Sequence, residues 1–464
     1  MDTQKLYSII DSYKDDIVEM LRRWISIPSV GAERSGENAP FGPEVRRMLD
    51  TALNDAAQLG FKTREFDGYV MDAQLGGGEQ TMGMLCHLDV VPAGDGWTHA
   101  PFGGEIEDGK LFGRGTIDDK GCGVLALFAM KAVREAGIPL RHGVRLILGC
   151  DEETGMQDMR HYAKCADLPD YGFSPDAEFP VINIEKGSMG IQLSALSEGE
   201  EGADIPVYEL YAGERANVVP GTAKAIIGAD VSDKLAQVRG ETGFDLKLTA
   251  LEGGRYELLA TGQQAHASMP HLGKNAAGML LIALSKLNAG GGIQGAIRVL
   301  AEKLGIEGYG ESLGLACEDA ESGRLTCNLG LLRFDGRVLT AFLDCRTPIC
   351  ANHAELCGRA VKQLEGTPVS FSLARSRTYH YIPAEHRVVK GLLKAYSEVT
   401  GSEGYAFAIG GGTYSRHIPC TVAFGPNFPG DIDMCHMPDE YIEIDKMMKC
   451  VKIFARAIVE LAGA

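Results

Sequence analysis

Basic residues are scarce in this sequence: 45 Lys and Arg stand against 63 Asp and Glu, which gives a formal net charge of −18. Binding to nucleic acid needs clustered Lys and Arg to neutralise phosphates, so this balance argues against a nucleic-acid partner. It argues equally against an anionic membrane surface. The acidity does not by itself indicate a cationic substrate, because acidic surfaces mostly serve solubility.

Long apolar runs and export signals are also lacking. No stretch reaches the roughly 20 apolar residues that a membrane-spanning helix needs. The opening residues, MDTQKLYSII, have no basic region followed by an apolar run, so we expect no signal peptide and a cytoplasmic location. The 12 cysteines include no C-x-x-C pair, which favours free thiols in a reducing compartment over a disulfide framework.

The length of 464 residues predicts more than one domain. Strand and helix patterns alternate up to about residue 186 and again from 384 to 464, which is typical of an α/β domain with a mixed sheet flanked by helices. Between them, residues 187–383 show strands, Gly-rich turns and two helical stretches. We therefore expect a discontinuous α/β domain (1–186 and 384–464) interrupted by an inserted α+β domain.

Apolar periodicity predicts the individual elements. The stretch 290–315 is Gly-rich and allows no assignment. The predicted helices are 3–27, 42–60, 122–136, 156–165, 274–288, 351–364, 386–399 and 445–461, and the clearest predicted strands are 70–75, 82–87, 144–150 and 420–425.

A strand that ends in His-x-Asp is the first candidate for chemistry. In GMLCHLDVVP (83–92), His87 and Asp89 are two residues apart and so project from the same face. A metal-bound imidazole usually has its other nitrogen held by a carboxylate, a place that Asp89 suits. Taken alone, the pattern is weak, because a histidine near a strand end is more often structural.

Two acidic clusters follow. In GRGTIDDKG (113–121), an ordinary helix N-cap would explain one aspartate but not both amid the glycines, and Asp118 could bridge two cations. In LGCDEETG (148–155), three acids leave a buried strand, which is unfavourable unless cations neutralise them. Successive side chains point in different directions, so one of Glu152 and Glu153 can bind metal while the other faces a metal-bound water.

Asp176 in FSPDAEFP (173–180) and His436 in DMCHMPDEYI (433–442) are ambiguous individually. Together with the residues above they make two histidines and three carboxylates, one bridging, which is the ligand set of a two-metal site. Oxygen and imidazole ligands suit Zn²⁺, and Mn²⁺ or Co²⁺ can also be accommodated. Such a pair activates a water and polarises a carbonyl, with Glu152 as general base.

These motifs, in this order and spacing, resemble the dinuclear zinc peptidase family over nearly the whole chain, and most of all its PepV-like bacterial dipeptidases. The resemblance implies a catalytic domain and an enlarged lid, hydrolysis of free dipeptides, and a cis peptide between Asp118 and Asp119. It implies that one metal is held by His87, Asp118 and Asp176, and the other by Asp118, Glu153 and His436.

The resemblance also implies lid residues. His266 in TGQQAHASMP would stabilise the oxyanion, and Asn217 and Arg346 would bind substrate. The loop GGGTYS (410–415), with Gly411 and Thr413, would offer backbone N–H groups to a terminal carboxylate, and Asp119 is a further predicted substrate contact. The lid is long enough for two lid-sized units, so we expect a monomer.

Three alternatives stay open at this point. An N-acyl amino acid amidohydrolase of the same family would share the metals and Glu152. A non-catalytic binding protein on the same fold would be expected to have lost Glu152, which is present. A dinuclear phosphoesterase is disfavoured because no Lys or Arg cluster accompanies the predicted ligands.

Overall fold

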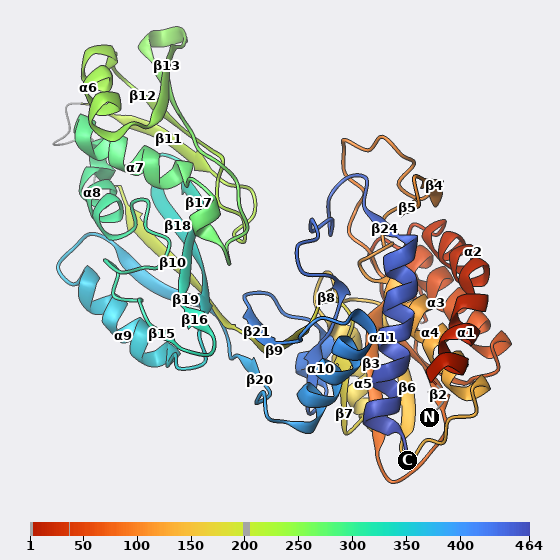
Figure 1. The fold of residues 1–464 in the computed structure, drawn as a ribbon. Helices are drawn as coiled ribbons and strands as arrows, with labels where there is room; N and C mark the ends of the chain where they lie inside the picture. Colours follow the sequence, from red (N-terminus) through yellow and green to blue (C-terminus); the bar gives the residue numbers. More distant parts are fainter. Residues whose placement is uncertain (1–2, 37, 198–204) are drawn as a thin grey trace. The chain divides into compact units, whose positions relative to one another are not determined.

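The computed structural model describes residues 3–36, 38–197 and 205–464, and the chain forms two compact units (Figure 1). The first unit comprises Met1–Ile184, Tyr381–Phe407 and Gly412–Ala464, and the second comprises Glu185–His380 and Ala408–Gly411. The chain therefore leaves the first unit and returns to it within a few residues of the expected positions 187 and 384. The catalytic and lid roles given to these parts stay predictions.

The first unit is built on a mixed sheet in the order β1-β2-β6-β3-β7-β22-β9. The central pairs β6–β3, β3–β7 and β7–β22 are parallel, whereas β1–β2, β2–β6 and β22–β9 are antiparallel. This sheet, flanked by helices, confirms the predicted fold class. Its strands are β1 (Lys62–Phe66), β2 (Val70–Leu75), β3 (Thr81–His87), β6 (Gly143–Gly149), β7 (Tyr171–Ser174), β9 (Val181–Glu185) and β22 (Thr421–Ala423).

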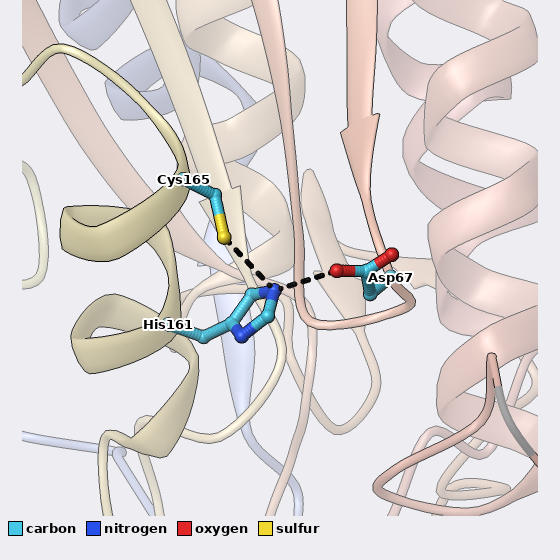
Figure 2. A group of neighbouring side chains, drawn as sticks. All are labelled: Asp67, His161 and Cys165. Atoms are coloured by element: carbon cyan, nitrogen blue, oxygen red, sulfur yellow. Dashed lines mark hydrogen bonds and ion pairs between the residues drawn. The ribbon is translucent and has the colours of Figure 1, made fainter.

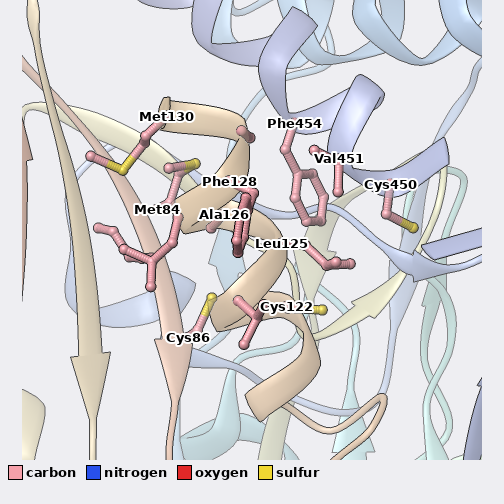
Figure 3. Packing of buried hydrophobic residues seen from close by; sticks show 14 of the residues in the cluster. Met84, Cys86, Cys122, Leu125, Ala126, Phe128, Met130, Cys450, Val451 and Phe454 are labelled. Carbon is pink, nitrogen blue, oxygen red and sulfur yellow. The ribbon is translucent and has the colours of Figure 1, made fainter. Parts of the chain in front are cut away.

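Helices from both ends of the sequence cover this sheet. Figure 3 shows α4 beside β3, with Phe454 and Val451 of α11 packed against it. Helix α4 is apolar on nearly all sides and is almost wholly buried, as expected for a helix in the core. The helices are α1 (Thr3–Ser12), α2 (Lys14–Ile25), α3 (Pro43–Gln58), α4 (Lys120–Glu135), α5 (Gln157–Cys165), α10 (Arg387–Thr400) and α11 (Ile444–Ala462).

The predicted single helix over 3–27 is wrong in one respect, because it is interrupted at Tyr13. The Tyr13 ring packs against Phe128 of α4 at 5.5 Å, and its hydroxyl accepts a hydrogen bond from Lys131 Nζ at 2.8 Å. Tertiary packing thus overrides the continuous helical periodicity.

Within the described residues, no helix combines the length and apolarity that a membrane crossing requires.

Short strands complete the first unit and its borders. Strands β4, β5 and β24 form a small antiparallel sheet, and β8 pairs with β23. Strands β20 and β21 lie where the chain passes between the units. These strands are β4 (Glu105–Glu107), β5 (Lys110–Phe112), β8 (Ala177–Glu178), β20 (His380–Tyr381), β21 (Ala406–Ile409), β23 (Pro426–Asn427) and β24 (Tyr441–Glu443).

The second unit has one eight-stranded sheet in the order β13-β14-β12-β11-β17-β18-β10-β19, with every neighbouring pair antiparallel. Its apolar face and four helices share one core. The strands are β10 (Gly187–Leu196), β11 (Val207–Ala212), β12 (Thr222–Ile227), β13 (Asp245–Ala250), β14 (Tyr256–Thr261), β17 (Thr326–Phe334), β18 (Val338–Thr347) and β19 (Ser370–Arg377), with the small pair β15 (Glu318–Asp319) and β16 (Gly323–Arg324) beside them.

The described residues of this unit form four α-helices, twice the number predicted. Helices α7 (Ala276–Leu287) and α9 (His353–Leu364) match predicted stretches, whereas α6 (Ser232–Thr242) and α8 (Gln294–Lys303) were not anticipated. Helix α6 buries only Leu235 and Val238, so its sequence has little apolar periodicity. Helix α8 lies in the unassigned Gly-rich stretch. The expected division into two lid-sized halves stays a prediction.

Candidate metal centre and active site

The predicted ligands of the first unit gather at one edge of its sheet. His87 ends β3, the acidic pair 152–153 follows β6, and Asp176 follows β7. These three strands are parallel neighbours, so their carboxyl ends meet at the same edge, where α/β sites usually form. Asp118 lies just before α4, and His436 comes from the loop between β23 and β24.

Two three-residue groups share Asp118. In the first, His87 Nε2 lies 2.9 Å from Asp118 Oδ1 and 3.7 Å from Asp176 Oδ1. In the second, His436 Nε2 lies 3.0 Å from Asp118 Oδ2 and 3.1 Å from Glu153 Oε2. The two oxygens of Asp118 therefore face different histidines, which is the arrangement of a carboxylate that bridges two cations.

The His87 ring shows that the first group fits a cation. Its Nδ1 lies 2.9 Å from the carbonyl oxygen of Asp89, to which it donates. Its Nε2 is buried, and within the described part of the chain no group makes a hydrogen bond of acceptable geometry with it. Although burial alone would lower the pKa of His87, the carboxylates of Asp118, Asp176 and Asp89 raise it well above its ordinary value, so a bound cation would take the place of a proton at Nε2.

The protonation of the cluster shows the same need for positive charge. Burial raises the pKa of Asp176 to about 6 and raises the pKa of Glu152 well above its ordinary value, with repulsion from Asp176 adding to the effect on Glu152. Hydrogen bonds to Asp118 and Glu153 raise the pKa of His436 to about 10. Without metal, the cluster therefore holds protons that a bound cation would displace.

We expect metal binding to depend strongly on pH. His436 is protonated below about pH 10 in the metal-free protein and must be neutral to bind, so each bound ion at that group releases a proton. Apparent affinity should rise by about tenfold per pH unit between roughly pH 6.5 and 8, as one displaced proton requires. Calorimetric titration in buffers of different ionisation enthalpy measures this release. An affinity independent of pH would contradict the expectation. His436→Asn is the control, because it removes the group whose proton the ion displaces.

The Asp89 carboxylate lies near both His87 and the acidic pair. Its carboxylate lies 3.5 Å from His87 Nδ1, farther than its carbonyl, and accepts hydrogen bonds from the backbone N–H groups of Glu152 at 3.2 Å and Glu153 at 3.1 Å. The chain turn after β3 presents the Asp89 carbonyl to the imidazole. The carboxylate is thereby left to hold the backbone of the acidic pair in place.

Predicted substrate residues of the second unit also lie close together. The backbone of Asn217 accepts a hydrogen bond from Ala267 N at 2.9 Å, and Val218 pairs with His266 in an isolated bridge. His266 is exposed, and its Nδ1 lies 2.6 Å from Ser268 Oγ.

Arg346 joins this group through the 410–411 loop. Its Nη1 donates to Gly410 O at 2.7 Å, and its Nε donates to Asp344 at 2.6 Å. A side chain at Gly410 would meet Ser268 at 2.4 Å, so the loop before Gly411 packs closely on the His266 turn. The structure thus brings together the predicted residues of this unit, and their roles stay predictions.

Two further predicted substrate residues belong to the first unit. Thr413 is buried, and its Oγ1 accepts a hydrogen bond from Ser415 N at 3.2 Å at the start of the short helix Tyr414–His417. Asp119 is fully buried, and its Oδ2 accepts a hydrogen bond from His87 N at 3.1 Å. The peptide bond between Asp118 and Asp119 is cis, which confirms that expectation.

The comparisons with known proteins agree with the site. The sequence profile of peptidase family M20/M25/M40 matches residues 83–460. The chain is 35% identical over 457 residues to "Putative dipeptidase YtjP" of Bacillus subtilis, covering 97% of this chain and 98% of that protein. The chain belongs to peptidase family M20/M25/M40. The predicted family is confirmed, and this member is a hydrolytic enzyme of the metallopeptidase class.

Solved structures share the fold of this peptidase at low sequence identity. Human carnosine dipeptidase 1 has a TM-score of 0.61 and 16% identity, covering 99% of this chain and 98% of that chain. The di-peptidase Dug1p of Saccharomyces cerevisiae has a TM-score of 0.57 and 14% identity, with coverage of 99% and 98%. Likeness at these identities shows the shared fold.

A buried ion pair that sequence analysis missed fastens two ligand segments of the peptidase. Arg114 donates to Glu440 Oε2 at 2.7 Å, and both side chains are buried. Glu440 Oε1 accepts hydrogen bonds from Gly115 N and Ile117 N, each at 3.0 Å. Arg114 also lies 3.3 Å from the carbonyl of His436, whose φ of 65° is uncommon for a residue other than glycine. The pair therefore holds the backbone just before Asp118 and at His436.

Glu440→Gln is expected to destabilise the first unit by about 3 kcal/mol, since it leaves the Arg114 guanidinium buried without a counter-charge. The matched control is Glu443→Gln, which removes a half-exposed ion pair with Lys446 and should change stability by less than about 1 kcal/mol. Urea unfolding of both variants measures the difference. Equal stability of the two variants would show that the buried pair is not holding the loop.

Proposed function

We propose that this chain is a two-metal dipeptidase that hydrolyses the peptide bond of free dipeptides. The observation that carries the proposal is the pair of ligand groups joined by Asp118, whose two oxygens face two histidines. The dipeptidase names of its relatives support the substrate class.

The proposed cofactors are two divalent ions, with Zn²⁺ favoured and Mn²⁺ or Co²⁺ accommodated, because the donors are imidazole nitrogens and carboxylate oxygens. His87, Asp118 and Asp176 would hold one ion, and Asp118, Glu153 and His436 the other. When bound, such a pair polarises the scissile carbonyl and makes an attacking water more acidic.

Glu152 is the proposed general base. It belongs to no ligand group among the described residues, yet its backbone is held beside Glu153 by Asp89. Its raised pKa suits a group that takes a proton from the water and then delivers it to the leaving amine. Burial is the largest cause of the raised pKa. It favours the protonated form of Glu152, so the side chain can hold the proton between these two transfers.

The second unit would supply substrate contacts in this proposal. His266 would donate to the developing oxyanion, and Arg346 would bind the terminal carboxylate beside the 410–413 loop. Asn217 lies next to His266 through the backbone contact described above and is proposed to bind the same substrate.

Activity on a panel of small substrates tests the proposal. The apoprotein would be reloaded with Zn²⁺, Mn²⁺ or Co²⁺ and given free dipeptides, free tripeptides and N-acetylated dipeptides. We expect free dipeptides to be cleaved fastest. Preference for N-acetylated substrates would instead identify an N-acyl amino acid amidohydrolase, and no activity with any metal would reject hydrolysis of both kinds.

We also propose a cytoplasmic location, which is supported by the free state of every cysteine in the sequence. Thiols persist unpaired in a reducing compartment, whereas exported proteins tend to use them in disulfides. Reaction of all the thiols with a small alkylating reagent in freshly lysed cells would test this. Oxidised cysteine pairs in that sample would count against it.

The active form is proposed to be a monomer, and mixing two inactive variants tests this. Glu152→Gln removes the base and His266→Ala removes the proposed oxyanion donor. If each site uses both residues of one chain, a mixture should show no more activity than the separate variants. Recovery on mixing would show that sites are shared between chains and would refute the monomer.

A further inference from the structure

A third group of metal-binding side chains lies outside the candidate active site. Figure 2 shows Asp67, His161 and Cys165 converging, with both contacts made at the same imidazole nitrogen. His161 Nε2 lies 3.0 Å from Asp67 Oδ2 and 3.5 Å from Cys165 Sγ. The three donor atoms lie within 4.8 Å of one another.

The local structure fixes these side chains in a converging arrangement. His161 and Cys165 are four residues apart on α5 and so lie on the same face of that helix. Asp67 comes from the turn between β1 and β2, where its φ is 51°. The ring of Tyr69, from the same turn, stacks on the His161 ring at 4.2 Å between centroids, which restrains the direction of the imidazole.

Hydrogen bonding alone serves this group poorly. The Nε2 atom carries either one proton or one lone pair, so it cannot serve both the carboxylate and the thiol well. A cation with three ligand bonds would satisfy all three groups at once. In tetrahedral zinc sites the bond lengths place neighbouring ligand atoms about 3.4 Å apart for nitrogen and oxygen and about 3.6 Å apart for nitrogen and sulfur. The observed separations of 3.0 and 3.5 Å from His161 Nε2 are close to these values, and the carboxylate and the sulfur, which lie within 4.8 Å of each other, would move closer together on binding.

We propose that Asp67, His161 and Cys165 form a third metal site, which takes a divalent transition ion such as Zn²⁺ or Co²⁺. The mixed set of carboxylate, imidazole and thiolate selects these ions over Mg²⁺ or Ca²⁺, which prefer oxygen ligands alone. Binding releases the Cys165 thiol proton to the solvent as the sulfur–metal bond forms. Two of the three side chains are exposed, so solvent can complete the coordination and the ion can exchange.

Cobalt spectroscopy distinguishes this site from the proposed catalytic pair. The catalytic ligand groups contain no sulfur, so a thiolate-to-cobalt charge-transfer band in the near ultraviolet reports the third site alone. The full-length protein, without a histidine tag, would be titrated with Co²⁺. We expect the intensity of this band to correspond to one Co²⁺ ion per chain at the third site. This result does not depend on whether the other two sites support dipeptidase activity.

Cys165→Ser is the deciding variant, and Cys350→Ser, which changes another exposed cysteine, is the matched control. We expect the band to be lost in the first and retained in the second, with hydrolytic activity unchanged in both. His161→Gln should weaken Co²⁺ binding at this site. Absence of the band in the unmodified protein, or its persistence in Cys165→Ser, would overturn the proposal.

Thiol protection gives an independent measurement with Zn²⁺. Alkylation by iodoacetamide, followed by mass spectrometry, compares Cys165 and Cys350 in one sample. Zn²⁺ should slow modification of Cys165 by about tenfold or more while leaving Cys350 unaffected, because a metal-held thiolate is no longer a free nucleophile. Equal rates at the two cysteines under saturating Zn²⁺ would contradict the site.

Discussion

Glu152→Gln is expected to lower turnover by about 10²–10⁴-fold while both metal ions stay bound. The substitution keeps the size and shape of the side chain but removes the oxygen that takes the proton from water. Glu152 is outside both ligand groups, so metal content should not change. Steady-state kinetics combined with metal analysis of the same preparation measures both quantities.

The neighbouring Glu153→Gln variant is the matched control. It changes the next residue of the acidic pair, but Glu153 lies 3.1 Å from His436 within a ligand group. We expect it to lose metal as well as activity, and excess metal should partly restore its rate. A Glu152→Gln enzyme with normal turnover would disprove the assignment of the base, and loss of its metal would indicate that Glu152 is a ligand.

Asp118→Ala is expected to weaken both metal sites at once. Each oxygen of Asp118 faces a different histidine, so its removal takes one ligand from each ion. Equilibrium dialysis of a chain that also carries Cys165→Ser, which removes the third site proposed above, should find fewer than about one ion per chain under conditions in which Cys165→Ser alone retains two.

Asp118→Asn grades this result, because it keeps one carbonyl oxygen for a single ion. We expect its metal content to lie between those of the alanine variant and the unmodified protein. Full retention of two ions by Asp118→Ala would mean that Asp119 or another acid bridges them. Substituting Asp119 would test that alternative. Its carboxylate already accepts a hydrogen bond from the backbone N–H of His87.

The sequence alone could predict part of the ligand cluster, because His87, Asp118 and the acidic pair 152–153 follow local rules, whereas Asp176 and His436 were ambiguous individually. A histidine and an acidic pair at the ends of apolar strands must meet if those strands are parallel neighbours, as β3 and β6 are. Asp118 was recognisable because a glycine-rich turn with two acids has no other simple explanation. Short sequence segments are therefore enough to indicate these ligands.

The support of the site could not be predicted in the same way. The ion pair of Arg114 and Glu440 depends on two segments from distant parts of the chain meeting in space. The available signal is that Arg114 and Glu440 are charged residues within segments that also contain predicted metal ligands. The preference of the His87 ring for the carbonyl of Asp89 depends on a backbone turn that residue types do not reveal.

The prediction of secondary structure failed where few residues of an element are buried or where tertiary packing overrides the apolar periodicity. Helix α6 has only two buried residues, so no apolar stripe marks it. The break at Tyr13 is set by α4, which comes more than a hundred residues later in the sequence. In both cases the deciding interactions are tertiary, and they lie beyond a reading of local pattern.

The order of the ligands along the sequence has a consequence for when the two ligand groups become complete during synthesis. His87, Asp118 and Asp176 are translated before the second unit, whereas His436 and Glu440, the partner of Arg114, are translated after it. A nascent chain therefore has one ligand group and lacks part of the other. Hydrolysis should begin only after residues 436–440 have left the ribosome, and chains that terminate before these residues should be inert.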